Sequence, residues 1–261
     1  MKDDFFIGYS ENAPKEGKKA IRPFLFVAAL FIIIGGVIFG MAQNPFADST
    51  FELTTETSLK GVYYEAPYPM LAVNDSLGER SVALLGFGKF GANKYIDHLM
   101  DETGDLNGVP LKISGNLIYY NDQTLIQITN KEKVNIIDHR NPGLIPQNEE
   151  GGIKTLEGEI VDPKCYFGVM KPGYGKIHRS CAARCISGGI PGVFVSESAD
   201  GTEEYYIITD TDGKAIHAEL VPFIGQPAEI SGEVSRVDNW NYIKLDLSNI
   251  KLLDKPSKIF H

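Results

Sequence analysis

The chain has 261 residues, of which 43% are apolar and 23% charged, and its net charge is −9. An acidic chain of this kind has no basic surface with which to neutralise phosphates, so nucleic acid is excluded as a partner. The length accommodates one membrane span and either two small domains or one large one. The 27 Gly and 14 Pro favour short strands and turns over a helical bundle.

The first predicted element is a transmembrane helix at residues 23–42. This run, PFLFVAALFIIIGGVIFGMA, contains no charged side chain, and at 1.5 Å per residue it matches a hydrocarbon core about 30 Å thick. Basic residues cluster just before it, whereas the first charges after it, Asp48 and Glu52, are acidic. This asymmetry predicts a cytoplasmic tail at residues 1–22 and an extracytoplasmic, periplasmic location for the rest.

A cleaved signal peptide is the alternative, because Gly40-Met41-Ala42 resembles a small-x-small cleavage site. The apolar run is longer than the usual signal-peptide core, and the leader before it is also long. We therefore predict a single-pass protein of the cell (inner) membrane that keeps its anchor.

The remainder of the chain shows an internal similarity. Residues 108–115 (GVPLKISG) match 225–232 (GQPAEISG) at an offset of 117, and the same offset aligns the polar turns at 121–122 and 238–239. Earlier in each half, 59–61 resembles 156–158, and the strand at 81–85 resembles that at 205–209. Short helix-forming stretches, 93–101 and 218–224, precede the final hairpins. This order indicates a duplicated domain.

Three strands, a short helix and two strands are the element order of an OB-fold barrel. The last hairpin, 225–233 followed by 242–245, resembles that of bacterial membrane-anchored extracytoplasmic OB-fold proteins. The predicted fold class is therefore mainly β, with one N-terminal transmembrane helix and two related OB-like β-barrels, a β-sandwich being the alternative. The predicted domains are 43–145 and 146–261, with the Gly-rich stretch 141–152 as linker.

The two halves differ by an insertion of about 20 residues in the second half, most of which falls at 162–191. In an OB-fold this is the loop between the first two strands, which commonly carries ligands. The insertion holds every cysteine of the chain: Cys165, Cys181 and Cys185. It also holds His178 and Met170. The sequence therefore predicts that any functional site lies here.

Residues 180–188 are predicted to form a two-turn helix, with Ser180 as N-cap and Gly188 as a left-handed stop. Cys181 and Cys185 then share one face. In the first helical turn, backbone N–H groups would lower the pKa of the Cys181 thiol. His178, just before the predicted cap, is expected to turn toward the same face.

Three interpretations of the cysteines remain open at this point. The first is a structural disulfide from Cys165 to Cys181 or Cys185. The second is a metal site with Cys165, His178, Cys181 and Cys185 as ligands and Met170 as an optional further ligand, a donor set that suits zinc, copper or an iron-containing centre. The third is a thiol–disulfide redox site at Cys181. All three predict that the sulfurs converge in one loop.

The C-x3-C pair with a nearby His and Met resembles the copper sites of oxidase subunits and copper-delivery proteins, although the His and Met that follow the second cysteine there are missing here. No hydrolase or nucleotide-binding motif is present, and the Gly-rich stretch 86–91 is typical of a turn at a strand end. We therefore expect no catalysis.

The predicted function is an anchored accessory subunit of a membrane redox or electron-transfer assembly, such as a respiratory complex, which binds integral membrane or extracytoplasmic proteins. In this function the Cys/His loop holds the metal or cofactor. The alternative is a purely structural adaptor whose cysteines staple a loop.

Overall fold

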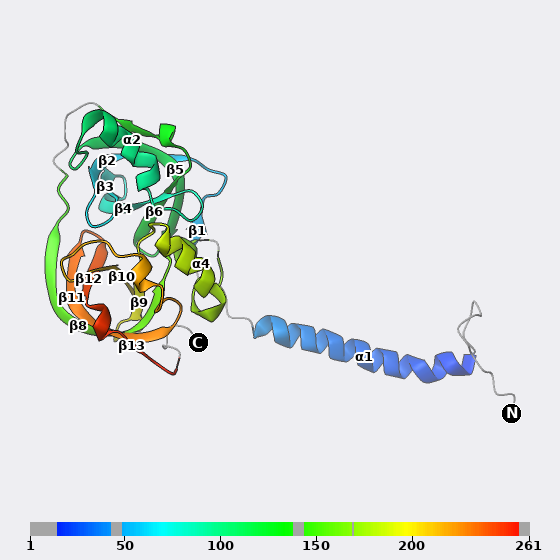
Figure 1. The fold of residues 1–261 in the computed structure, drawn as a ribbon. Helices are drawn as coiled ribbons and strands as arrows, with labels where there is room; N and C mark the ends of the chain where they lie inside the picture. Colours follow the sequence, from blue (N-terminus) through cyan, green and yellow to red (C-terminus); the bar gives the residue numbers. More distant parts are fainter. Residues whose placement is uncertain (1–14, 43–48, 138–143, 169, 256–261) are drawn as a thin grey trace. The chain divides into compact units, whose positions relative to one another are not determined.

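The protein is described here from a computed structural model, which covers residues 15–42, 49–137, 144–168 and 170–255. The chain forms two units, residues 1–47 and residues 48–261, and each is described by itself (Figure 1).

The first unit contains one helix, α1 (Lys15–Met41), of 27 residues. It begins eight residues before the predicted membrane run, so Pro23 lies inside it. By length and apolar composition α1 is able to cross a membrane, and a helix of this kind near an N-terminus acts as a membrane anchor or as a signal sequence.

The first barrel of the second unit is closed by five strands, β2 to β6. Its elements are β1 (Thr50–Phe51), β2 (Thr57–Tyr64), β3 (Met70–Asp75), β4 (Gly78–Gly86), α2 (Asn93–Thr103), β5 (Pro110–Tyr120), β6 (Gln123–Ile128), η1 (Lys131–Lys133) and β7 (Val134–Ile136). The strands pair antiparallel in the order β5–β2–β3–β4, and β6 closes the barrel by pairing parallel with β4 and antiparallel with β5. The short strands β1 and β7 pair with β5.

The second barrel repeats this topology with the helical insertion after its first strand. Its elements are β8 (Asn148–Val161), α3 (Pro163–Phe167), α4 (Gly175–Ser187), β9 (Val193–Glu197), β10 (Glu203–Thr209), η2 (Ala218–Leu220), β11 (Pro227–Val237), β12 (Trp240–Leu245), η3 (Leu247–Asn249) and β13 (Lys251–Leu252). The strand order is β12–β10–β9–β8–β11, and β12 closes the barrel by pairing with both β10 and β11. The short strand β13 pairs with the beginning of β11.

Equivalent residues occupy equivalent positions in the two barrels, which confirms the predicted fold. Leu59 faces Ile113 across the β2–β5 pair, and Leu156 faces Ile230 across the β8–β11 pair. The aligned strand glycines, Gly115 and Gly232, also have matching surroundings. A Cβ on Gly115 would lie 2.3 Å from the Gln127 carbonyl oxygen, and one on Gly232 would lie 2.2 Å from that of Lys244. Both strands therefore need glycine where the backbones approach closely.

The linker prediction is wrong from residue 148 onward. Asn148 to Gly152 form the beginning of β8, where Asn148 pairs with Val237 of β11. These residues are polar and exposed because this end of the long strand extends beyond the buried part of the barrel. The stretch 141–143 lies outside the described residues.

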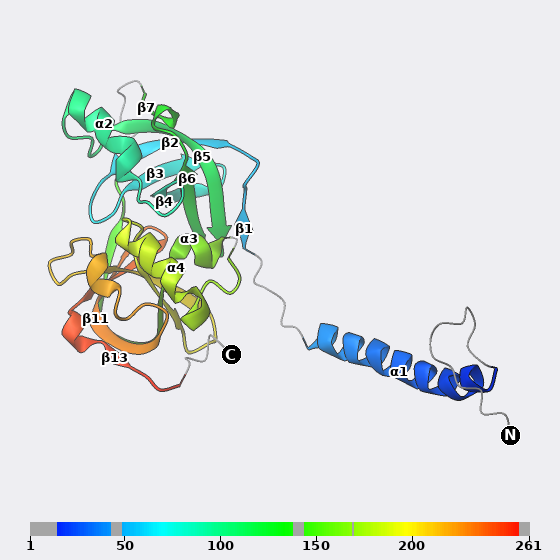
Figure 2. The ribbon, with the colours of Figure 1, turned by 45° about the vertical axis from the view of Figure 1, so that its right-hand side comes forward.

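The two barrels pack against each other through a shared apolar core. Trp240 of β12 is fully buried, and its indole N–H donates a hydrogen bond to the Ser81 carbonyl of β4 at 2.9 Å. The Tyr68 hydroxyl donates to the Ile208 carbonyl at 2.7 Å. The same core includes Phe167 and Cys185 of the insertion. Figure 2 shows α3 and α4 lying where the barrels meet.

Candidate metal centre

The helix α3 begins at an Asp-Pro pair. The Asp162 carboxylate accepts a hydrogen bond from the Lys164 backbone N–H at 2.9 Å, and Pro163 occupies the first helical turn. Such a cap with a following proline is a strong start signal for a helix. It places Asp162 and Cys165 one turn apart on the same short helix.

The helix α4 begins five residues earlier than predicted, at Gly175. The buried carboxylate of Glu159, from β8, accepts a hydrogen bond from the Gly175 N–H at 2.5 Å and supplies the cap that was predicted for Ser180. Cys181 is therefore in the middle of the helix, and its predicted position in the first helical turn is wrong. Gly188 also differs from prediction, because its φ is −84° and the left-handed residue is Gly189 at +100°.

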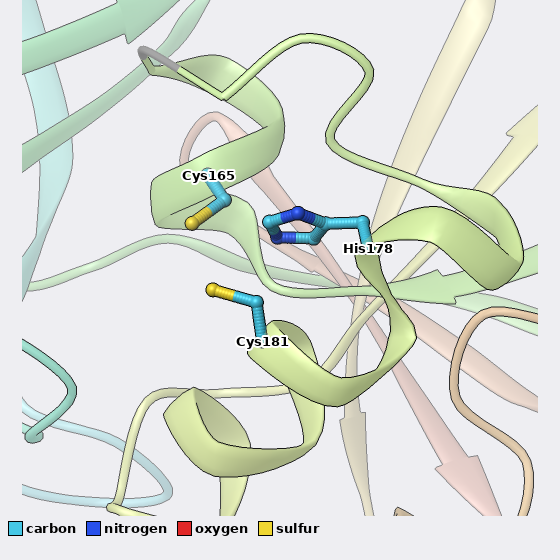
Figure 3. A group of neighbouring side chains, drawn as sticks. All are labelled: Cys165, His178 and Cys181. Carbon is cyan, nitrogen blue, oxygen red and sulfur yellow. The ribbon is translucent and has the colours of Figure 1, made fainter.

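The predicted ligands meet in two overlapping groups. Cys165, His178 and Cys181 each offer a ligand atom within 4.8 Å of the others. Figure 3 shows the two sulfurs facing each other, with the His178 ring pointing toward them. Cys185 instead joins Asp162 and Cys165 in a second group of the same size. Met170 is 44% exposed.

Burial of the ligands favours a bound ion. Asp162 and His178 are 0% and 3% exposed, yet the Asp162 Oδ2 and His178 Nε2 atoms have no hydrogen-bond partner among the described residues. A buried polar atom left unpaired costs about 1–3 kcal/mol. A metal ion bound to these atoms would remove that cost.

The three cysteines are free thiols. A hydrogen bond with Cys185, together with burial and the nearby Asp162 carboxylate, raises the pKa of the Cys165 thiol far above its ordinary value. Burial lowers the pKa of His178, partly opposed by the charge of Asp162. The imidazole is therefore neutral at pH 7, which is the form that binds metals.

The first barrel contributes a cation to the cluster. In the turn after β4, the Lys89 ammonium donates to the Cys181 sulfur at 2.9 Å, and this contact raises the pKa of Lys89. The stretch 86–91 is thus a turn, as predicted, but it also reaches the cysteines. Gly188 allows this approach, since a Cβ there would lie 1.9 Å from the Lys89 carbonyl oxygen.

A second lysine ties the insertion to the same turn. Lys164 of α3 is 7% exposed, and its ammonium donates to the carbonyls of Gly86 at 2.9 Å and Gly88 at 2.8 Å. Burial lowers the pKa of this lysine. The cluster is therefore built from both barrels.

Sequence reasoning missed Asp162, Lys89 and Lys164 as parts of the cluster. The Asp-Pro helix start was a usable signal for Asp162, because it fixes a short helix that contains Cys165. No local pattern marks the lysines, whose partners lie 76 or more positions away in the chain. Comparison with known protein families finds no matching family model, and no curated protein matches the chain.

Proposed function

We propose that this chain is a non-catalytic, membrane-anchored accessory subunit of a membrane redox assembly, and that its Cys/His loop binds a thiophilic metal ion outside the cytoplasm. One observation carries the metal assignment: the buried, unpartnered Nε2 of His178 lies in a group with the free sulfurs of Cys165 and Cys181. Thiolate and neutral imidazole are donors that zinc, copper and iron accept.

The membrane part of the proposal is supported by α1 and by the basic residues Lys15, Lys18, Lys19 and Arg22 on its N-terminal side. This flank favours a cytoplasmic N-terminus and an anchor that is retained. The partners of such a subunit are integral membrane or extracytoplasmic proteins. We place the subunit in a redox assembly because its cluster of soft ligands is attached to a membrane anchor.

Metal content and thiol count test the metal assignment together. The full chain, purified in detergent without chelator, is analysed for metals, and its thiols are titrated after denaturation with and without reductant. We expect bound metal and three reactive thiols in both titrations. Cys165→Ser should abolish metal binding. The control variant His217→Ala, at a histidine that belongs to neither ligand group, should retain it.

A chain without metal that shows one reactive thiol before reduction and three after it would overturn this assignment. That result would instead support the adaptor alternative, in which Cys165 forms a disulfide that staples the loop. The Cys165 sulfur lies within 4.8 Å of the sulfurs of both Cys181 and Cys185, so a small movement would allow a disulfide to either.

Topology is tested by labelling intact cells with an impermeant maleimide, in a variant whose native cysteines are replaced by serine. A cysteine introduced as Ser10→Cys, in the part of the chain outside the described residues, should resist labelling. The exposed control Ala199→Cys should label. The reverse pattern would refute the orientation, and a mature N-terminus at Gln43 would refute the anchor.

The partner is tested by chemical cross-linking in native membranes, followed by mass spectrometry. We expect cross-links from the barrels to subunits that carry a redox cofactor. Cross-links confined to proteins without such cofactors would refute the place in a redox assembly and leave the metal assignment intact.

A further inference from the structure

Cys165 belongs to both ligand groups, although the groups are otherwise different. One contains His178 and Cys181 from α4, and the other contains Asp162, from the start of α3, and Cys185. A single tetrahedral ion would gather the four sulfur and nitrogen ligands on one centre. In the structure, Cys185 instead groups with Asp162 and Cys165 and not with His178.

Each group also contains its own unsatisfied buried atom. In the first group it is Nε2 of His178, and in the second it is Oδ2 of Asp162. The helix cap uses only the Oδ1 atom of Asp162, which accepts from the Lys164 N–H. A single ion held by Cys165, His178 and Cys181 would leave the Asp162 oxygen unpaired in a fully buried position.

We propose that the loop binds two ions of the zinc class, bridged by the Cys165 thiolate. This inference rests on the proposed function, since it requires that the first group binds metal. The second ion lies between Asp162, Cys165 and Cys185. Zinc accepts sulfur, imidazole and carboxylate donors alike, whereas soft Cu(I) disfavours carboxylate. On binding, the three thiols lose their protons to solvent.

The charge of the cluster agrees with two divalent ions. Three thiolates and one carboxylate carry four negative charges, and two Zn²⁺ ions neutralise them. A buried cluster without net charge avoids the large cost of burying unpaired ions. Lys164 keeps its two carbonyl partners in this state. Lys89 is only partly buried, so solvent screens its charge.

With one ion on the first group, two thiolates and the Asp162 carboxylate leave a net charge of about −1, because Cys185 keeps its proton until it binds metal. Lys89 and Lys164 are the cations near the cluster that offset this charge. Lys89 contacts Cys181, which is a ligand of the first ion and not of the second. Lys89→Met should weaken binding of the first ion more than binding of the second.

The stoichiometry of metal binding tests the proposal. The full chain in detergent is reduced, stripped with chelator, loaded with Zn²⁺, freed of excess metal and analysed for zinc per chain. We expect two ions in the wild type, one in Asp162→Asn, one in His178→Ala and none in Cys165→Ser. Asparagine is a good helix cap, so Asp162→Asn removes a ligand but keeps α3. Asp246→Asn is the matched control, because Asp246 caps η3 in the same way and belongs to neither ligand group.

Co²⁺ replaces Zn²⁺ as a spectroscopic probe of the bridge. Two Co²⁺ ions that share a thiolate couple magnetically, so the EPR signal per cobalt should fall as the second ion binds. In Asp162→Asn the signal should grow linearly up to one equivalent.

The outcomes separate the two proposals. No zinc in the wild type would overturn the proposed metal function itself. One zinc per wild-type chain would overturn the second ion and leave the first. Two ions in both the wild type and Asp162→Asn, or two ions without loss of EPR signal, would place the second ion elsewhere and refute the bridge.

Discussion

Replacing His178 by alanine should change stability very differently with and without metal. The side chain is 3% exposed, so its removal from the packed loop costs about 2–4 kcal/mol. The same change removes the buried Nε2 atom that lacks a partner, which returns about 1–3 kcal/mol. In chelator, the free energy of unfolding should therefore fall by only about 1 kcal/mol.

In zinc the loss should be larger. An ion present at 100 times its dissociation constant stabilises the folded chain by about 2.7 kcal/mol. Outer-shell changes alone weaken metal sites by about 10–100-fold, and His178 is a proposed direct ligand. At 100-fold weaker affinity the same zinc concentration contributes about 0.4 kcal/mol. The stabilisation gained from zinc should therefore be smaller in His178→Ala than in the wild type by about 2 kcal/mol.

The assay is urea unfolding of the detergent-solubilised chain, in chelator and at a fixed free zinc concentration. His217→Ala is the control, because this histidine also has an unpartnered buried ring nitrogen but stacks edge-on against Tyr68 and belongs to neither ligand group. Its response to zinc should equal that of the wild type. The reasoning is refuted if His178→Ala gains as much stability from zinc as the wild type does.

Three further predictions concern the barrel interface and the thiols. Trp240→Ala should destabilise both barrels together by about 3–5 kcal/mol, because the fully buried ring fills their shared core; two separate unfolding transitions with one unchanged would contradict this. Gly188→Ala should lower the free energy of unfolding by about 1–3 kcal/mol, since the new Cβ would meet the Lys89 carbonyl. The control Ser187→Ala, at an exposed residue, should leave it nearly unchanged in the same urea titration. Zinc affinity should rise with pH between about 6 and 8, because the raised pKa of Cys165 keeps this thiol protonated until the metal displaces the proton. Calorimetry in buffers of different ionisation enthalpy measures the protons released on binding. An affinity that does not depend on pH would argue against thiolate ligation.

The amino-acid sequence alone was sufficient for the elements that depend on local pattern. The uncharged run predicts α1, and the alternation of apolar residues with turn residues predicts the strands. The repeat at an offset of 117 even aligns Gly115 with Gly232, whose close backbone contacts match in the two barrels. Such features are readable because periodicity and turn chemistry act over a few residues.

The composition of the cluster depended on tertiary structure. The start of α4 is set by Glu159, a strand residue 16 positions before Gly175, and not by the local Ser180. Cys185 and Asp162 come together only because α3 and α4 lie close to each other where the two barrels pack (Figure 2). Lys89 reaches Cys181 across 92 positions of sequence. Contacts of this kind follow from how two closed barrels pack, and no short-range pattern encodes that packing.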